Sequence, residues 1–194
     1  TRATIGAAQI NKMAGVADAR QSIIVAATSD IYNMGIAGAA AIGGGVGAGA
    51  GVTVTVVENT TKATVATGAD MKAERDVNVT ALSKADFVSF SAAAAGGGSV
   101  ALAGGVGVVS LTSTTTAQLG GKTVAGGNVE VLADDQKRVA SMAGSVSVGL
   151  GVAGVGGAIS VLSIDKTTTA EILANANVTA LVKDGTLSGY TGAD

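Results

Sequence analysis

Apolar residues alternate with other residues along several stretches of this chain, and a period of two is typical of β-strands. Val52, Val54 and Val56 form one such run, and Val146 and Val148 belong to another. Frequent glycine in the same stretches disfavours a helix by about 1 kcal/mol per residue. The pattern therefore predicts an all-β chain.

Charged residues are confined to segments that separate long uncharged runs. No charged side chain occurs within residues 31–57, 87–121 and 139–164. Each run is long enough to cross a bilayer as a helix, and small residues at four-residue spacing could pack such helices together. The period-two valines and the near absence of interfacial Trp and Tyr favour strands instead. A membrane-inserting or pore-forming segment is kept as an alternative.

A threonine-rich motif recurs at nearly constant spacing, which indicates a repeat protein. The motif Thr-Thr-x-Ala ends on Ala63, Ala117 and Ala170, which lie 54 and 53 residues apart. Residues 3–5, Ala-Thr-Ile, resemble the end of one more copy. The spacing predicts a structural unit of 52–54 residues.

Other positions keep the same step, so the repeat fills nearly the whole chain. Val79 precedes its counterpart Val131 by 52 residues, and Val108 precedes Val161 by 53. We therefore predict a single repetitive segment over residues 1–194, which begins within a repeat like an excerpt from a longer polypeptide. Its approximate units are residues 17–69, 70–122 and 123–176, with a partial unit at 1–16 and a divergent tail at 182–194.

Stacked repeats of strands and turns form a β-solenoid, in which each unit contacts its neighbours and the units together bury a continuous core. The apolar residues are chiefly Ala and Val, so the core is expected to be narrow. Equivalent valines such as Val79 and Val131 should point inward one unit apart. Val108 should also point inward, whereas Lys84 should lie in a turn. Because known solenoid coils are shorter than 54 residues, each unit is expected to hold two or three coils.

The composition excludes several classes of function. The 194 residues include no His, Cys, Trp or Pro, and the net charge is −2 without a basic cluster. The lack of cysteine removes disulfides and thiolate metal sites, and nucleic-acid binding would require clustered cations. A nucleophile would need a Ser-Lys or paired-carboxylate site, and none stands out from the repeat. We therefore expect no enzymatic activity, no catalytic, cofactor-binding or metal-binding residues, and no small-molecule substrate.

Two glycine-rich motifs invite nucleotide-binding interpretations that their surroundings contradict. Residues 120–123 read Gly-Gly-Lys-Thr, but Thr116 stands where a phosphate-binding loop needs its first glycine. Residues 149–154 match Gly-x-Gly-x-x-Gly, but the β-like run 159–164 follows where an amphipathic helix is required. We interpret the first as a surface turn and the second as a chance match.

Acidic residues are the remaining candidates for a ligand site, because carboxylates bind calcium. Asp134 and Asp135 form the densest pair, followed by Asp70, Glu74 and Asp76. The Gly-Gly-x-Gly-x-Asp motif of calcium-binding solenoids is absent. These carboxylates are therefore expected to lie in solvated turns.

Three stretches carry a resemblance to a known family. Residues 76–81 read Asp-Val-Asn-Val-Thr-Ala, residues 158–161 read Ala-Ile-Ser-Val, and residues 167–172 read Thr-Thr-Thr-Ala-Glu-Ile. Over about residues 20–180 the chain resembles the repeats of filamentous haemagglutinin-like and leukotoxin-type adhesins, giant two-partner-secreted proteins of Gram-negative bacteria. The resemblance implies a right-handed β-helical shaft on the bacterial cell surface.

Two further surface motifs are given no role. Asn59, Asn78 and Asn177 begin formal glycosylation sequons, which usually mean nothing in a bacterial protein. An ice-binding face needs a Thr pair on every coil, about 4.8 Å from the next. One threonine cluster per unit argues against such a face.

We therefore expect a structural or adhesive shaft segment of a large exported protein, located outside the cell and acting without cofactors. Copies are expected to associate along the fibre or laterally, because the uncharged runs provide no electrostatic repulsion. Other parts of the parent would contact the host or neighbouring cells. A self-assembling extracellular filament subunit is the alternative.

Overall fold

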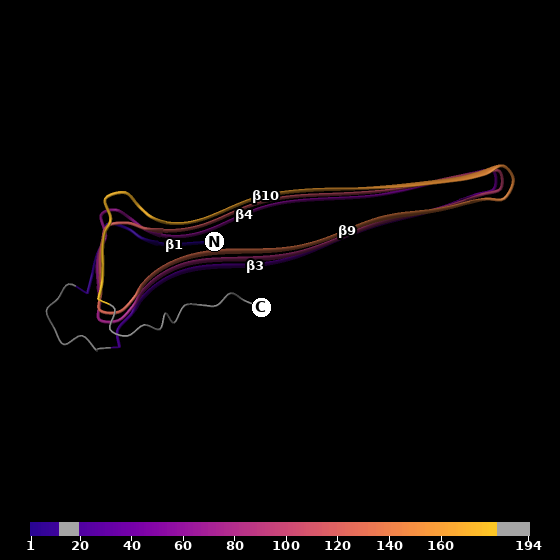
Figure 1. Cartoon of the computed structure of the whole chain (residues 1–194). Coiled ribbons are helices and arrows are strands. Elements are labelled where there is room, and N and C mark those ends of the chain that lie inside the picture. The colour runs from indigo at the N-terminus through magenta and orange to yellow at the C-terminus, as the bar shows by residue number, and fades with distance from the viewer. Residues whose placement is uncertain (12–19, 182–194) are drawn as a thin grey trace.

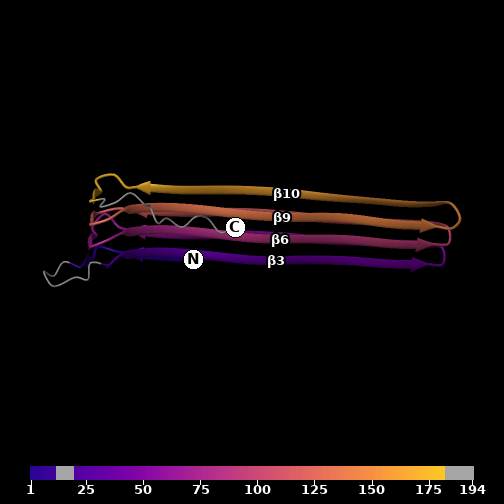
Figure 2. The ribbon, with the colours of Figure 1, turned by 60° about the horizontal axis from the view of Figure 1, so that its bottom comes forward.

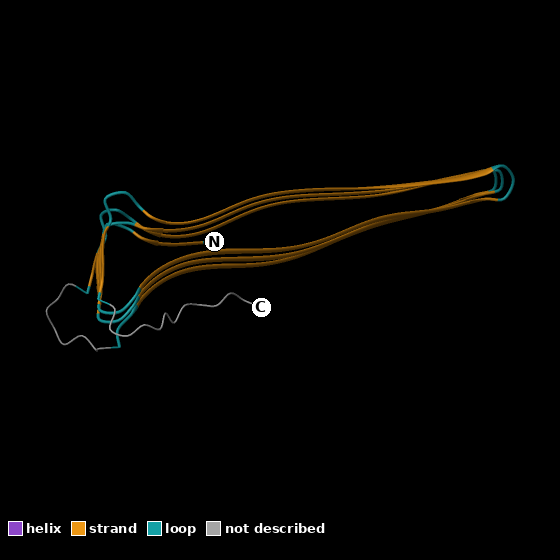
Figure 3. Ribbon diagram, viewed as in Figure 1, coloured by secondary structure: helices purple, strands orange, loops and turns teal. Residues whose placement is uncertain are grey.

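The computed structural model describes residues 1–11 and 20–181, and strands joined by turns make up this part of the chain without any helix (Figure 3). The all-β prediction is therefore confirmed. The predicted divergent tail at 182–194 lies outside the described residues, and so does the predicted boundary between the partial unit and the first full unit.

Three kinds of strand recur in a constant order along the chain: a long outgoing strand, a long return strand and a short closing strand. The outgoing strands are β3 (Ile23–Gly43), β6 (Val77–Gly97) and β9 (Val129–Gly149). The return strands are β4 (Val46–Val65), β7 (Val100–Leu119) and β10 (Ala153–Ile172), with the shorter β1 (Arg2–Ile5) beside them. The closing strands are β2 (Gln9–Ile10), β5 (Asp70–Ala73), β8 (Lys122–Ala125) and β11 (Asn177–Ala180).

Strands of one kind pair with each other in parallel and form three sheets. The outgoing sheet has the order β3-β6-β9, the return sheet β1-β4-β7-β10 and the closing sheet β2-β5-β8-β11. Paired residues are repeat equivalents: Val79 pairs with Val131. Ala117 likewise pairs with Ala63 on one side and Ala170 on the other. The 52–54-residue repeat and its alignment are confirmed.

One repeat unit crosses each sheet once, so it makes a single circuit, an arrangement consistent with a β-solenoid. The expectation of two or three coils per unit is wrong. The reason is strand length, since β3 has 21 residues and β4 has 20, whereas most strands in globular proteins have 3–10. Two such strands and one short strand account for a whole unit.

The circuits form a broad, thin body with a base and an arm. At the base, the closing sheet connects the outgoing and return sheets, which stand apart there (Figure 1). Away from the base the two long sheets converge into the arm, which ends in tip turns at residues 44–45, 98–99 and 150–152. A second view shows successive circuits lying one above another with their long strands nearly parallel (Figure 2).

The base contains the largest apolar cluster, to which all three sheets contribute. Val79 of the outgoing sheet and Met71 of the closing sheet are fully buried in it. Val131 packs against the same cluster, so the inward orientation predicted for Val79 and Val131 is confirmed. Phe87 and Leu111 belong to a smaller buried cluster in the arm. The period-two pattern thus identifies the interior correctly near the base.

In the outer half of the arm the usual arrangement is reversed, since small residues point inward and larger apolar residues point outward. Gly51 is buried, whereas its neighbour Val52 and the following Val54 are exposed. Val108 also faces outward and Val109 is buried in its place, so the inward orientation expected for Val108 is wrong.

The reversal follows from the close approach of the two long sheets. A Cβ atom built on Gly47, Gly49 or Gly51 would lie 2.0, 2.6 or 2.3 Å from a carbonyl oxygen of the outgoing sheet. A Cβ atom built on Gly105 would likewise lie 2.6 Å from the carbonyl oxygen of Gly144. At these positions even a methyl group would force the backbones apart, so bulky side chains can only be placed on the outer faces.

Gly105→Ala is therefore expected to destabilise the protein by about 1–3 kcal/mol, because the new methyl group would press against the Gly144 backbone. The adjacent Gly104→Ala provides a matched control, since its Cβ would be 4.0 Å from the Gly157 oxygen. This control should be neutral or stabilising by up to about 1 kcal/mol, because alanine restricts the unfolded chain. Guanidinium unfolding measures both, and equal midpoints would contradict the close approach.

Candidate functional site

A polar layer crosses the interior between the base core and the arm. Its inward positions on the outgoing sheet are Ser29, Ser83 and Asp135, which pair in register. The equivalent positions on the facing return sheet are Asn59, Ser113 and Lys166. Neutral residues occupy these positions in the first two circuits, and charged residues occupy them in the third.

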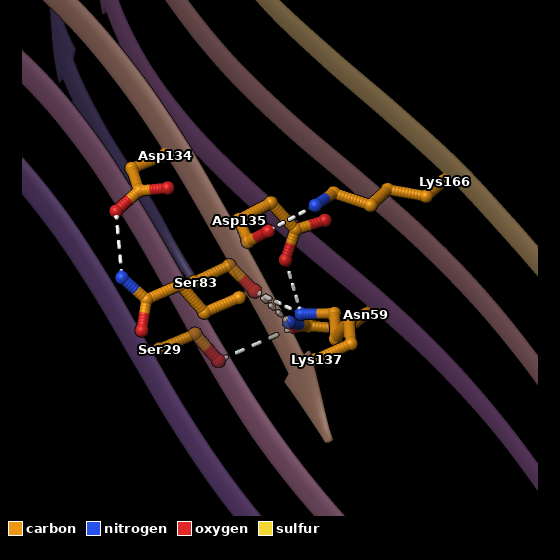
Figure 4. Close-up of polar contacts among 8 residues, drawn as sticks. Ser29, Asn59, Ser83, Asp134, Asp135, Lys137 and Lys166 are labelled. Carbon is orange, nitrogen blue, oxygen red and sulfur yellow. Dashed lines mark hydrogen bonds and ion pairs between the residues drawn. The ribbon is translucent and has the colours of Figure 1, made fainter. Parts of the chain in front are cut away.

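Side-chain contacts connect this layer from one circuit to the next (Figure 4). Ser29 Oγ donates to Asn59 Oδ1 at 3.3 Å, and Asn59 Nδ2 donates to Ser83 Oγ at 2.9 Å. Ser83 Oγ also accepts a hydrogen bond from Lys137 Nζ at 2.6 Å, and Lys137 forms an ion pair with Asp135. The contacts therefore run through all three circuits.

Asp135 and Lys137 form a buried ion pair, since their side chains are only 0% and 4% exposed. From the opposite sheet, Lys166 Nζ donates to the backbone carbonyl oxygen of Asp135. The neighbouring Asp134 accepts a hydrogen bond from Gln136 Nε2 at 3.2 Å. Both aspartates lie within β9 and one is buried, so the expectation of a solvated turn is wrong for this pair.

The buried pair is suited to holding circuits in register. A soluble ligand cannot reach a carboxylate whose side chain has no exposed surface. Taking each ion out of water costs several kcal/mol, which the ion pair and the surrounding hydrogen bonds must offset. The ion pair lies within β9, but a slip of β9 would separate Lys137 from Ser83 on β6 and Asp135 from Lys166 on β10, so these contacts oppose slippage.

Strand parity in the sequence indicates the orientation of this pair. Asp135 and Lys137 stand at the same alternation as Val131 and Val139, and successive residues of a strand point to opposite sides. All four therefore share the inward side of β9. The charge of these residues indicated a solvated position instead, and burial is possible because Ser83 on the neighbouring strand β6 and Lys166 on the facing return sheet supply polar partners.

A second candidate site is the outer surface of the arm on the return sheet. We call it the return face, and it comprises Val46, Ala48, Ala50, Val52 and Val54 of β4 with their partners on β7 and β10. Two adjacent rows are entirely β-branched: Val52, Val106 and Ile159, then Val54, Val108 and Val161. None of the return-face residues is charged.

The two glycine-rich motifs lie in turns that lead into strands. Gly121 lies between β7 and β8 with φ of 72°, and a Cβ there would be 2.2 Å from the Ala69 oxygen. Lys122 is the exposed first residue of β8. Residues 149–154 pass from the end of β9 through the tip turn into β10. Nucleotide binding requires a strand, a loop and then a helix, which neither motif has.

The other acidic candidates lie at or beside the closing strand β5. Asp70 is its first residue, and Glu74, just after it, pairs with Lys72 at 3.2 Å. Asp76 Oδ1 accepts a hydrogen bond from the Asn128 backbone N–H at 2.9 Å. Within residues 1–11 and 20–181, no three acidic side chains gather closely enough to hold a metal ion.

Lys84 and the three sequon asparagines all lie in strands. Lys84 is exposed on β6 instead of lying in a turn, so that expectation is wrong. Asn59 is buried on β4, where it belongs to the polar layer. Asn78 lies on β6 and Asn177 on β11.

The threonine clusters recur on every circuit, because one unit makes one circuit. Thr60, Thr114 and Thr167 pair in register across the return sheet. Threonines therefore recur about 4.8 Å apart on successive circuits, and the expectation that they are too widely spaced for an ice-binding face is wrong. Glu58 and Lys62 flank Thr60 on the same side of β4, so charged residues interrupt the neighbouring rows.

In the part of the chain that the structure describes, no helix is long and apolar enough to span a membrane. Comparisons of the chain with models of known protein families, with curated proteins and with solved structures found no match. The resemblance to filamentous adhesins therefore stays a prediction from sequence motifs.

Proposed function

We propose that this chain is a structural or adhesive shaft segment of a large exported cell-surface protein, folded as a right-handed β-solenoid. The observation that supports this most strongly is the register. Strands of all three sheets pair with their equivalents one unit away, over the full length of the long strands. Such a stack can be extended by adding units. The strand edges of the last circuit offer the same backbone hydrogen-bonding groups that bind one circuit to the next.

The proposed mechanism is mechanical. Hydrogen bonds between parallel strands run from circuit to circuit, so they lie along the stacking direction in all three sheets. The polar layer adds side-chain contacts in the same direction, such as the 2.9 Å bond from Asn59 to Ser83. Tension along the stack would therefore load many hydrogen bonds together.

The proposed shaft is much wider across the stack than the distance that each unit adds along it. Each unit uses 52–54 residues but advances the stack by one strand spacing, about 4.8 Å. A return strand of 20 residues extends about 66 Å across the stack at about 3.3 Å per residue. Each added unit lengthens the stack very little but adds much surface on the outer sides of the two long sheets. This favours a role in which those outer sides make contacts.

A self-assembling extracellular filament subunit is the second candidate, and one observation favours it. Large apolar side chains are exposed on both outer faces of the arm, including Ile36 on the outgoing sheet and Val54 on the return sheet. Contact between chains would remove these side chains from water. The two candidates differ in whether the assembly grows within one long chain or between several chains.

The proposal assigns the segment no catalysis, cofactor, nucleic acid or small-molecule substrate. Contact with a host or a neighbouring cell is assigned to other parts of the parent protein. The extracellular location rests on the resemblance to two-partner-secreted adhesins described above.

Inserting three further copies of residues 77–128 after Asn128 is expected to raise the stack by about 14 Å and leave the arm length unchanged. Cryo-electron microscopy or small-angle X-ray scattering would measure both dimensions. A matched insert with Val79→Asp in each copy should not add ordered height, because Val79 is fully buried in the base core. A particle that lengthens along the arm, or does not grow, would contradict the stack.

A further inference from the structure

The return face is an apolar surface of a kind that proteins normally cover. Val52, Val54, Ile159 and Val161 are between 48% and 63% exposed on it. The inward residues at the same level of β4 are Gly51 and Thr53, so the arm holds its bulkier apolar groups outside. β-Branched side chains are stiff and lose little conformational freedom when they pack.

The charge pattern suits a second copy of the same face. The central strand β7 contains no charged residue from Val100 to Leu119. The central strand β6 of the outgoing sheet is also uncharged from Phe87 to Gly97, and its first outward charges, Asp86 and Lys84, lie nearer the base. Two return faces therefore meet without burying an unpaired charge or opposing like charges.

The size of the face predicts the strength of the contact. Its five rows extend about 26 Å along the strands, and three strands span about 14 Å across them. A pair of such faces covers roughly 700 Å² of plane, which is below the roughly 1,200 Å² that stable specific interfaces bury and within the range of weak contacts. The contact should therefore be weak and reversible for three circuits, and should strengthen with each added circuit.

Lipid is the other candidate occupant of an uncharged apolar face, and the experiment below distinguishes it from a second copy. The edges of β3, β4, β9 and β10 that are open among the described residues do not decide between the two, because further circuits would pair them in the longer shaft proposed above.

We propose that two copies of this chain pair through their return faces, one lying flat on the other across a two-fold axis. The β-branched rows at Val52 and Val54 pack against those of the partner at the usual separation of stacked sheets, about 10 Å. This contact rests on the structural role proposed above and deepens it, because it names the lateral partner. Parallel shafts on one cell, or on two cells, would adhere in this way.

Sedimentation velocity of the whole chain over a range of concentrations tests the pairing. The unmodified chain should show a reversible monomer–dimer equilibrium. Val108→Asp places two carboxylates in the paired face and should raise the dissociation constant at least about tenfold. The matched control is Val88→Asp, also an outward valine on a central strand but on the opposite sheet, and it should change the constant less than about twofold.

Circular dichroism checks that both variants keep their strands. If Val108→Asp does not fold, Val54→Asp on the edge strand β4, which is 63% exposed, replaces it. A chain that is monomeric at all concentrations, or equal effects of the two variants, would overturn the pairing. Monomers that co-sediment with phosphatidylcholine vesicles would overturn it in favour of lipid. A monomeric chain whose stack still grows with inserted units would leave the shaft proposal intact.

Discussion

Val109→Asp is expected to destabilise the protein by about 4 kcal/mol or more. Val109 is 1% exposed and points between the two long sheets, where an aspartate has no cationic partner. A charge without a partner in a dry interior is among the costliest single substitutions. The denaturant midpoint of the variant should therefore fall far below that of the unmodified chain.

The neighbouring Val108→Asp is the matched control, because the same carboxylate then stands on the outer face. Its expected cost is about 1 kcal/mol, which reflects the low strand propensity of aspartate. Guanidinium unfolding at a concentration where the chain is monomeric compares the two variants. A larger loss of stability for Val108→Asp than for Val109→Asp would show that Val108 points into the arm and Val109 points outward.

Lys137→Ala is expected to cost about 3–5 kcal/mol, because it leaves the buried carboxylate of Asp135 without its ion-pair partner. The hydrogen bond that Lys137 donates to Ser83 at 2.6 Å is lost as well. Asp135→Ala should cost a similar amount, since it leaves the Lys137 ammonium group buried alone. Urea unfolding of each variant at neutral pH measures these losses.

The double variant Asp135→Ser with Lys137→Ala measures the net contribution of the ion pair to stability. The single variants measure instead the cost of leaving one buried charge without its partner. At these two positions of β9 the double variant gives the third circuit the residues of the second, Ser83 and Ala85. Replacing a buried ion pair with neutral groups is often neutral or stabilising by about 1–4 kcal/mol. The double variant should thus be at least as stable as the unmodified chain. A double variant as unstable as Lys137→Ala would contradict this account.

The pairing of strands could be read from the sequence because the stack is parallel and in register. Equivalent residues of successive repeats then become neighbours, as Ala63, Ala117 and Ala170 do. The number of coils per unit could not be read in the same way. A period of two identifies strands without limiting their length, and strands of 20 residues lie outside the usual range.

The candidate sites were predictable only in part. Parity places Asp135 and Lys137 on the side of β9 that also holds Val131, but burial depends on Ser83 of the next strand and on the sheet opposite. The sequence did not predict that the return face lies on the outside, because its alternating valines have the pattern expected of a buried core. Val108 and Val109 are adjacent and equally apolar, so no local property distinguishes the buried one.

The sequence by itself determined the strands, the repeat, the register and which residues share a side, because these depend on neighbours along the chain and one unit away. The tertiary structure alone decided which side of the arm is inside. That choice depends on the distance between the two long sheets, and at Gly47, Gly51 and Gly105 the sheets approach too closely for a side chain. Near the base the closing sheet holds the long sheets apart, and there the valines point inward.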